Sequence, residues 1–384
     1  MKTALALCGG GSLGAYEMGV WKYLREHSYD FDIVTGTSIG AINGAMIATN
    51  QYEVAMDMWN SVKVGDIMAG GLDFDRTFLK NIDVSRGSKW NEFIGTFMQN
   101  KGADTRPLRR MLEEKIAPLH VNRGPKKFGI VTCHFPSFKE VDVLVNDLND
   151  DQVIDYLMAS ASCWPVFPVY QMNGQEYVDG GWRNNLPIDF ALRLGADRVI
   201  AVLLNSLPRA QKRELFDLPN VTLIQPSLPQ GSFLAFTHNA IESNMKMGYL
   251  DTAKVFGTLK GNRVTLENDP EFKELCSRYF RAYLDHEPSD FLKVAHHQRS
   301  RLILPIRDEI ERSFIIALEA FMDIYGLDFH TTYHIEEIMT VLKEKIRTET
   351  RGAKVKRIPL YLSSGDIPRL VGSKELWYFA QILK

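Results

Sequence analysis

The sequence GTSIG at residues 36–40 decides the predicted fold. Before it, residues 31–34 (FDIV) are typical of a short buried strand, and after it, residues 41–48 (AINGAMIA) are small and apolar, as in a tightly packed helix. Strand, sharp turn and helix form the context of a nucleophile elbow, which holds a strained serine hydroxyl out of a sheet. Gly36 and Gly40 leave room for the close approach of strand and helix. The alternative interpretation is a glycine-rich turn that only packs a helix on a sheet.

A second glycine-rich turn precedes the elbow. Residues 3–7 (TALAL) indicate a first, central strand, and residues 15–24 carry apolar side chains at helical spacing. GGGSLG at 9–14 joins them, and this loop is expected to lie at the same sheet edge as the elbow. Successive glycines let backbone N–H groups face one point, such as an oxyanion beside the elbow serine. The candidate donors are Gly9, Gly10, Gly11 and Ser12.

The same loop also fits G-x-G-x-x-G, the fingerprint of dinucleotide-binding domains. That fingerprint needs an acidic residue at the carboxyl end of the second strand, where it binds the ribose. Here the acidic residue, Asp32, opens the second strand, and the strand ends at the elbow. A nucleotide-binding loop is therefore the weaker alternative.

Composition excludes several classes of protein. The 384 residues are 45% hydrophobic and 24% charged with a net charge of −2, so nothing favours nucleic acid as a partner. Cys8, Cys133 and Cys163 lie among apolar or small residues and are predicted to be buried free thiols of a reducing compartment. The apolar run at 3–8 is too short for a signal peptide, and no run approaches the roughly 20 residues of a membrane span. We expect a cytoplasmic protein.

The order of predicted elements indicates two domains, 1–260 and 261–384. The first alternates strands and helices, with further strands at 127–133, 140–145, 198–204 and 221–224 and helices at 155–162 and 236–256. Residues 52–125 are less regular and suggest short helices, either a plain layer or an apolar cap over the site. After Gly261 long helices dominate, the clearest at 310–322 and 335–346.

A basic cluster follows the last predicted helix. It contains Arg351, Lys354, Lys356 and Arg357. Such clusters are usually solvated surface, and the alternative is a patch that makes transient contact with a membrane surface.

Asp179 is the candidate base for an acyl-transfer site. It follows a short predicted strand at 176–178 and precedes Gly180 and Gly181, so little bulk separates its carboxylate from a neighbouring turn. By itself the Asp-Gly pair is more typical of an ordinary turn.

The motifs together resemble the patatin-like phospholipases. GGGSLG at 9–14, GTSIG at 36–40 and DGG at 179–181 match that family in type, order and approximate spacing. ASAS at 159–162, with Pro165 and Phe167 after it, is similar to the family's stretch before the aspartate, and NNLP at 184–187 to the stretch after it. The resemblance covers about residues 1–260.

The resemblance implies a three-layer α/β/α fold with a mainly parallel central sheet, and a Ser–Asp dyad that cleaves acyl esters of lipids without a histidine. Ser38 would be the nucleophile, Asp179 the base, and the amides of the 9–14 loop the oxyanion hole. Many relatives have arginine or lysine where Leu13 stands, and donation by backbone amides does not depend on that side chain. Asn184 and Asn185 are expected to stabilise their turn. No metal or organic cofactor is implied, and no EF-hand-like loop is present, so we expect calcium-independent hydrolysis.

Two other functions remain open at this point. One is an α/β-hydrolase esterase with a Ser-His-Asp triad, which needs a downstream histidine such as His238. That fold normally has several strands before its elbow, whereas here the elbow ends the second strand. The other is a non-catalytic module that binds acyl chains or nucleotides through the glycine loops.

Overall fold

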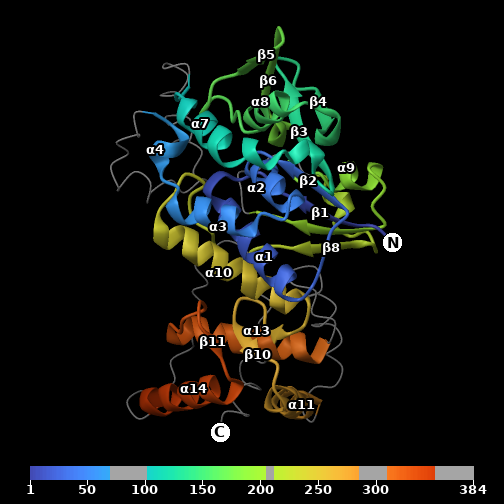
Figure 1. Ribbon diagram of the computed structural model, residues 1–384. Coiled ribbons are helices and arrows are strands. Elements are labelled where there is room, and N and C mark those ends of the chain that lie inside the picture. The colour runs from blue at the N-terminus through green and yellow to red at the C-terminus, as the bar shows by residue number, and fades with distance from the viewer. Residues whose placement is uncertain (70–101, 205–211, 285–308, 351–384) are drawn as a thin grey trace. The chain divides into compact units, whose positions relative to one another are not determined.

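The computed structural model describes residues 1–69, 102–204, 212–284 and 309–350, and the described residues divide into two compact units after Thr252. The first unit is built on a sheet with the strand order β5-β6-β3-β2-β1-β7-β8, and β4 also pairs with β3 (Figure 1). Its strands are β1 (Thr3–Leu7), β2 (Ile33–Thr37), β3 (Lys127–His134), β4 (Glu140–Leu144), β5 (Tyr170–Met172), β6 (Gln175–Asp179), β7 (Arg198–Val202) and β8 (Val221–Ile224).

The central part of this sheet is parallel. All pairings from β3 through β2, β1 and β7 to β8 are parallel, whereas β3 pairs antiparallel with β4 and β6, and β6 with β5. β1 lies in the middle because the chain builds β2 and β3 on one side of it and β7 and β8 on the other. In such sheets ligands bind outside the carboxyl ends of the strands, where the direction of winding changes. The turns after β1 and β2 lie at this point.

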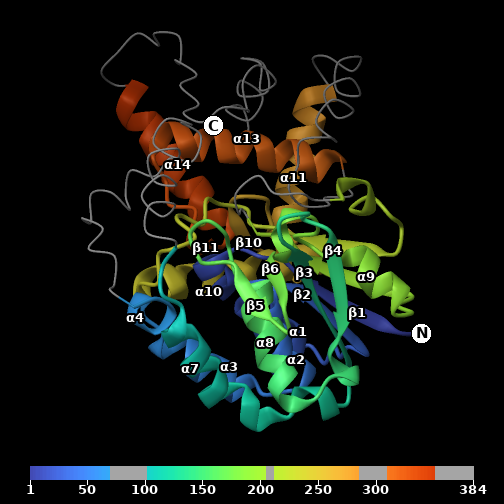
Figure 2. The same ribbon diagram turned by 90° about the horizontal axis from the view of Figure 1, so that it is seen from above.

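Helices cover both faces of the sheet. They are α1 (Ala15–Glu26), α2 (Ile39–Ala48), α3 (Tyr52–Ser61), α4 (Val64–Ile67), α7 (Arg106–Lys115), α8 (Asp150–Ser160), α9 (Ile188–Arg193) and α10 (His238–Val255). Gly44 of α2 lies against the Phe128 ring, and Gly129 lies against the Phe190 ring of α9. Consecutive residues of a strand face opposite sides, so α2 and α9 belong to opposite layers, as Figure 2 also shows. The predicted mainly parallel α/β/α fold is confirmed.

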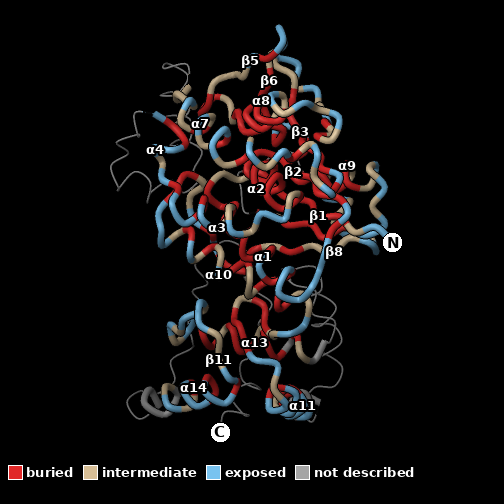
Figure 3. The backbone as a smooth tube through the Cα atoms, viewed as in Figure 1, coloured by how far each residue is buried: buried red, intermediate tan, exposed pale blue. Residues whose placement is uncertain are grey.

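The core of the first unit runs along the central strands and α2. All five residues of β2 and all ten of α2 are buried, and red dominates these elements in Figure 3. Complete burial explains why residues 41–48 are apolar on all sides except at Asn43, rather than amphipathic.

The register of β3 has a direct consequence for the site. Val131 pairs with Thr37, the last residue of β2, and the next residue, Thr132, pairs with Asp179, the last residue of β6. β3 therefore brings Ser38, the residue after Thr37, and Asp179 to the same level of the sheet on its two sides, although 141 positions (179 − 38) separate them in the sequence.

The region predicted as a cap is described only in part. α3, α4 and α7 are helices as expected, and Ile67 and Leu108 on two of them line the cavity described below. The amphipathic stretch at 90–98 lies outside the described residues.

The second unit is mainly helical, as predicted. It contains α11 (Pro270–Leu284), α13 (Glu309–Tyr325) and α14 (Ile335–Thr350), and a small sheet of β9 (Leu259–Lys260), β10 (Thr265–Glu267) and β11 (Thr332–Tyr333). The buried carboxylate of Glu319 accepts hydrogen bonds from the N–H groups of Asn262, Arg263 and Val264, which fixes the turn before β10. The basic cluster at 351–357 lies outside the described residues. Among the described residues, no helix has the length and apolarity needed to cross a membrane.

Candidate active site

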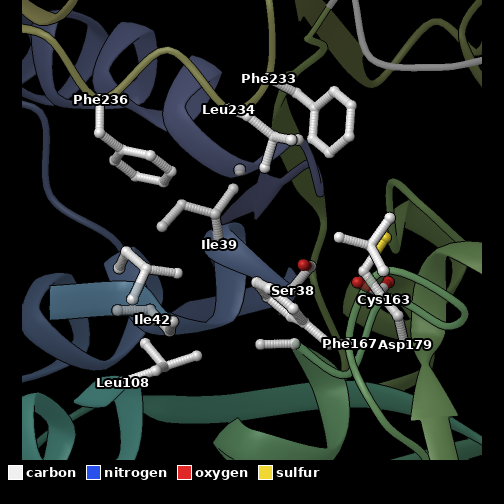
Figure 4. A pocket seen from close by; sticks show the side chains of 15 residues that line it. Ser38, Ile39, Ile42, Leu108, Cys163, Phe167, Asp179, Phe233, Leu234 and Phe236 are labelled. Atoms are coloured by element: carbon white, nitrogen blue, oxygen red, sulfur yellow. The ribbon is translucent and has the colours of Figure 1, made fainter. Parts of the chain in front are cut away.

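A mainly apolar cavity, with about 670 Å³ of empty space when its open mouth is included, lies at the carboxyl ends of β1 and β2 (Figure 4). Ser38 and Asp179 face one another across it in Figure 4, the serine from the start of α2 and the aspartate from the end of β6. The residues that line it are Gly10, Gly11, Ser38, Ile39, Ile42, Ile67, Leu108, Ala161, Cys163, Val166, Phe167, Asp179, Phe233, Leu234 and Phe236. A serine and a carboxylate thus share a pocket whose other side chains suit a hydrocarbon chain.

Ser38 has the backbone of a nucleophile elbow. Its φ of 56° and ψ of −123° are unusual for a residue with a side chain, and such strain is typical of functional serines at this turn. A Cβ on Gly36 would lie 2.2 Å from the Gly40 oxygen, and one on Gly40 would lie 2.6 Å from the Leu7 oxygen. Both positions therefore require glycine, and α2 begins directly after Ser38, so its N-terminus is aimed at the site.

Asp179 is fully buried and held by the backbone on both sides. Its Oδ1 accepts a 2.7 Å hydrogen bond from the Gly181 N–H, and its own N–H donates to the Ser162 oxygen at 2.8 Å. A Cβ on Gly180 would lie 2.3 Å from the Val131 oxygen of β3, so glycine allows the close approach of this turn to the sheet. The carboxylate is fixed in orientation, as a base that acts on one hydroxyl requires.

The glycine loop at 9–14 lies against the elbow. Of its four backbone N–H groups predicted as oxyanion donors, two donate hydrogen bonds within the protein, and the two others have no acceptor among the described residues. The Gly9 N–H donates to the Asn185 oxygen at 3.0 Å and the Ser12 N–H to the Phe233 oxygen at 2.8 Å. Gly10 and Gly11 line the cavity, and within the described part of the chain their N–H groups have no protein acceptor. Of the four predicted donors, the geometry leaves Gly10 and Gly11 as those able to face an oxyanion.

Ser160 is a residue whose role the sequence did not reveal. Its hydroxyl accepts a 2.8 Å hydrogen bond from the Ser38 N–H and donates one of 2.7 Å to the Val131 oxygen. The side chain is fully buried at the end of α8 and ties the elbow to β3. The run of small residues at 159–162 is the available signal, since it allows the close contact, but small residues alone do not distinguish this serine from Ser162.

Asn184 and Asn185 stabilise the site from outside the cavity. The Asn185 amide donates to the Gly9 oxygen at 3.0 Å, and the Thr37 hydroxyl donates to the Asn184 oxygen at 2.8 Å. Neither asparagine lines the cavity among the residues described. This agrees with the expected structural role.

A buried polar network lies beneath the glycine loop. Glu17 accepts hydrogen bonds from the Cys8 N–H at 2.8 Å and from the Asn43 amide at 2.7 Å, and the Trp59 indole donates to Asn43 at 2.9 Å. Burial raises the pKa of Glu17 to about 8, although both hydrogen bonds act to lower it. The network connects the start of the loop to α1 and α2.

The alternatives receive no support from the described site. His238 lies on the surface of α10, 3.8 Å from Glu242, and none of the residues found to line the cavity is a histidine. His296 and His297 lie outside the described residues. The Asp32 carboxylate accepts from the Thr3 N–H at the amino ends of the strands, the edge opposite to the glycine loop, so it is not placed for a ribose.

The structure also shows how far the cysteines are buried and whether side chains gather around a possible metal site. Cys8, Cys133 and Cys276 are buried free thiols, but Cys163 is only partly buried because it lines the cavity. Across the described ranges, no group of three or more His, Cys, Asp or Glu side chains is arranged to hold a metal ion.

Comparison with known proteins places this site in a family. Residues 5–192 match the patatin-like phospholipases. Patatin-like phospholipase domain-containing protein 7 of Mus musculus is 28% identical over 205 residues, which are 52% of this chain but 13% of that protein. Lysophospholipase NTE1 of Mycosarcoma maydis is 24% identical over 219 residues, 56% of this chain and 10% of that protein. The chain thus aligns with a small part of these relatives' length.

Among solved structures, the crystal structure of VipD from Legionella pneumophila is 12% identical with a TM-score of 0.43, over 91% of this chain and 87% of VipD. The matched family region contains the glycine loop, the elbow and the Asp-Gly-Gly turn that meet at the cavity. Residues 5–192 of this chain therefore form a domain that matches the patatin-like phospholipase family.

Proposed function

We propose that the protein is a serine lipid acyl hydrolase of the phospholipase A or lysophospholipase type. The observation that carries this proposal is the shared cavity: Ser38 and Asp179 face one another in a pocket lined by apolar side chains, with the Gly10 and Gly11 amides at its wall. An acyl chain would occupy the apolar part, and its ester carbonyl would lie between the serine and the loop. The patatin-like phospholipase family and the lysophospholipase relative support this substrate class.

In the first half-reaction, Asp179 takes the proton of the Ser38 hydroxyl while Oγ attacks the ester carbonyl carbon. The carbonyl electron pair moves to oxygen, where the Gly10 and Gly11 N–H groups stabilise the charge by about 3 kcal/mol per donor. Collapse of the tetrahedral intermediate breaks the ester C–O bond. The leaving alcohol takes its proton from Asp179, and the acyl group remains on Ser38.

In the second half-reaction, Asp179 takes a proton from a water molecule that attacks the acyl-enzyme. Collapse releases the fatty acid, and Ser38 regains its hydroxyl proton. Every step uses the protein's own residues and water.

The test compares wild-type protein, Ser38→Ala and the control Ser61→Ala, whose serine is exposed on α3. Substrates are a p-nitrophenyl acyl ester, a lysophospholipid and a diacyl phospholipid. We expect Ser38→Ala to abolish release of nitrophenol and fatty acid and Ser61→Ala to retain both. If a folded Ser38→Ala protein hydrolysed these esters at the wild-type rate, the proposed function would be wrong.

A further inference from the structure

Four aromatic side chains form a surface cluster beside the candidate site. We define Phe135, Phe138, Trp164 and Trp182 as the aromatic cluster. The ring centroids of Phe138 and Trp182 are 5.0 Å apart, those of Phe135 and Trp164 are 5.6 Å apart, and those of Trp164 and Trp182 are 6.1 Å apart. Trp182 is 41% exposed and the other three rings are partly exposed. A contiguous group of exposed aromatic rings marks an interaction surface far more often than scattered apolar residues do.

The two tryptophans of the aromatic cluster come from segments that also contribute residues to the cavity wall. Trp164 lies between Cys163 and Val166, both of which line the cavity, and Trp182 follows the Asp179-Gly180-Gly181 turn. Phe135 and Phe138 come from the loop that follows β3, the strand that lies between β2 and β6 and brings Ser38 and Asp179 to one level of the sheet. A surface that binds this cluster would therefore lie next to the candidate active site.

The surroundings of the aromatic cluster are basic rather than acidic. The segments 134–139, 162–168 and 180–183 contain no acidic residue, and Lys139 and Arg183 are exposed. Of the acidic residues that flank these loops, Asp179 belongs to the candidate site, and Glu140 and Glu176 accept hydrogen bonds. Lys212 and Asn184 contact the Glu140 carboxylate at 3.2 and 2.9 Å, and Gln171 donates to Glu176 at 3.2 Å.

Aromatic rings bordered by cations match the chemistry of a phospholipid surface. Tryptophan rings favour the headgroup region of a bilayer, where one side of the ring is apolar and the other is hydrated. Lysine and arginine near such a surface are attracted to anionic headgroups. Binding of a soluble protein partner would not require exposed aromatic rings and cations to lie next to a pocket suited to acyl chains.

We propose that the aromatic cluster, with Lys139 and Arg183, docks the protein on an anionic phospholipid surface. The cavity would then open next to the membrane from which its substrate comes. This inference rests on the proposed hydrolase function for its biological meaning, but vesicle binding can be measured without hydrolysis.

The binding test uses full-length protein that carries Ser38→Ala, so that the vesicles stay intact. Sedimentation with phosphatidylcholine vesicles, with and without phosphatidylserine, gives the bound fraction. We expect the additional change Trp182→Ala to weaken binding about tenfold, because about 1.4 kcal/mol of apolar burial is lost. Tyr29→Ala is the matched control: Tyr29 is also 41% exposed, and it precedes β2 at the amino ends of the parallel strands.

Two further experiments test the charges of Lys139 and Arg183 and the position of the tryptophan rings at the lipid surface. Arg183→Glu together with Lys139→Glu should weaken binding to vesicles that contain phosphatidylserine and have little effect on those of pure phosphatidylcholine. Brominated lipids should quench the fluorescence of the Ser38→Ala protein, and this quenching should fall when Trp164 and Trp182 are replaced by phenylalanine, a change that preserves packing.

The outcomes separate this proposal from the proposed function. With Ser38 present, Trp182→Ala should lower the ratio of vesicle-lipid hydrolysis to p-nitrophenyl ester hydrolysis about tenfold. Unchanged vesicle binding and unchanged quenching in folded variants would overturn the docking surface, even if Ser38 proved essential for ester hydrolysis. Binding lost equally in the Tyr29→Ala control would also overturn it.

Discussion

The buried hydroxyl of Ser160 accepts a hydrogen bond from the backbone N–H of Ser38, at 2.8 Å. The strained backbone of the elbow is thereby tied to β3 through Val131, which accepts a hydrogen bond from the same hydroxyl. Ser160 acts on the geometry of the nucleophile and does not line the cavity, so we regard it as a positioning residue.

Replacing Ser160 with alanine should therefore lower kcat more than it raises KM. The change leaves a buried N–H without its acceptor, a loss of about 1–3 kcal/mol, which lowers the rate roughly 5-fold to 150-fold if it falls on the transition state. Ser162→Ala is the matched control, because the Ser162 hydroxyl, two residues after the end of α8, donates to the Met158 oxygen of that helix. Steady-state kinetics on a p-nitrophenyl ester give kcat and KM for both variants. Equal effects of the two changes would show that Ser160 has no special role.

Gly11 is expected to tolerate no side chain. Its φ is 58°, and a Cβ would lie 2.4 Å from the Phe233 backbone oxygen, so Gly11→Ala must displace the loop that carries the proposed oxyanion donors. We expect kcat to fall at least about a hundredfold, as when an oxyanion donor is lost. Gly174→Ala is the control: Gly174 also has a positive φ, 72°, but a Cβ there would meet no neighbouring atom within 4 Å, so strain occurs without a clash. A Gly11→Ala enzyme as active as Gly174→Ala would contradict the assigned donors.

Glu17 should make the stability of the fold depend on pH. Its pKa is raised from 4.5 to about 8 by burial, so its ionised form destabilises the native state. The contribution to stability is complete below about pH 4.5 and is lost as the pH rises towards 8, with a slope of up to about 1.4 kcal/mol per pH unit. Glu17→Gln should flatten this dependence.

Thermal unfolding between pH 5 and 9 measures the effect. The control is Glu53→Gln, since the Glu53 side chain is 86% exposed and should change nothing. Parallel pH curves for wild-type and Glu17→Gln protein would show that the buried carboxyl does not titrate as described.

Much of this fold follows from local sequence patterns. The run at 3–7 coincides with β1, and the strand, turn and helix around Ser38 are found as predicted, because glycines and complete burial leave few other conformations. The helix predicted at 155–162 is α8, which begins earlier, at Asp150, and ends at Ser160. Asn149 and Gln152 form a capping box at its start, and this local pattern explains the earlier beginning.

Other features depend on contacts that no local pattern contains. β9 and β11 are two residues long, too short for a periodic signal, and exist because they pair with β10. The sequence predicts the amides of Gly9 and Ser12 as oxyanion donors together with those of Gly10 and Gly11, since all four follow β1. The engagement of the first two by Asn185 and Phe233 depends on segments more than 170 residues away in the sequence. The contact of Ser160 with Ser38 has the same long-range origin.

The central claim is that Ser38 attacks the ester and that Asp179 is its base without a histidine between them. Covalent labelling by a serine-directed fluorophosphonate, with the modified peptide identified by mass spectrometry, tests both parts at once. The proteins to compare are the wild type, Ser38→Ala, Asp179→Asn, and single alanine substitutions of His134, His238, His296 and His297.

We predict one adduct, on Ser38, formed about 10²–10⁴ times more slowly in a folded Asp179→Asn protein and within a few fold of the wild-type rate in each histidine variant. An adduct on another residue would contradict the assignment of the nucleophile. A folded His238→Ala protein that labels as slowly as Asp179→Asn would contradict the dyad and support a Ser-His-Asp triad instead.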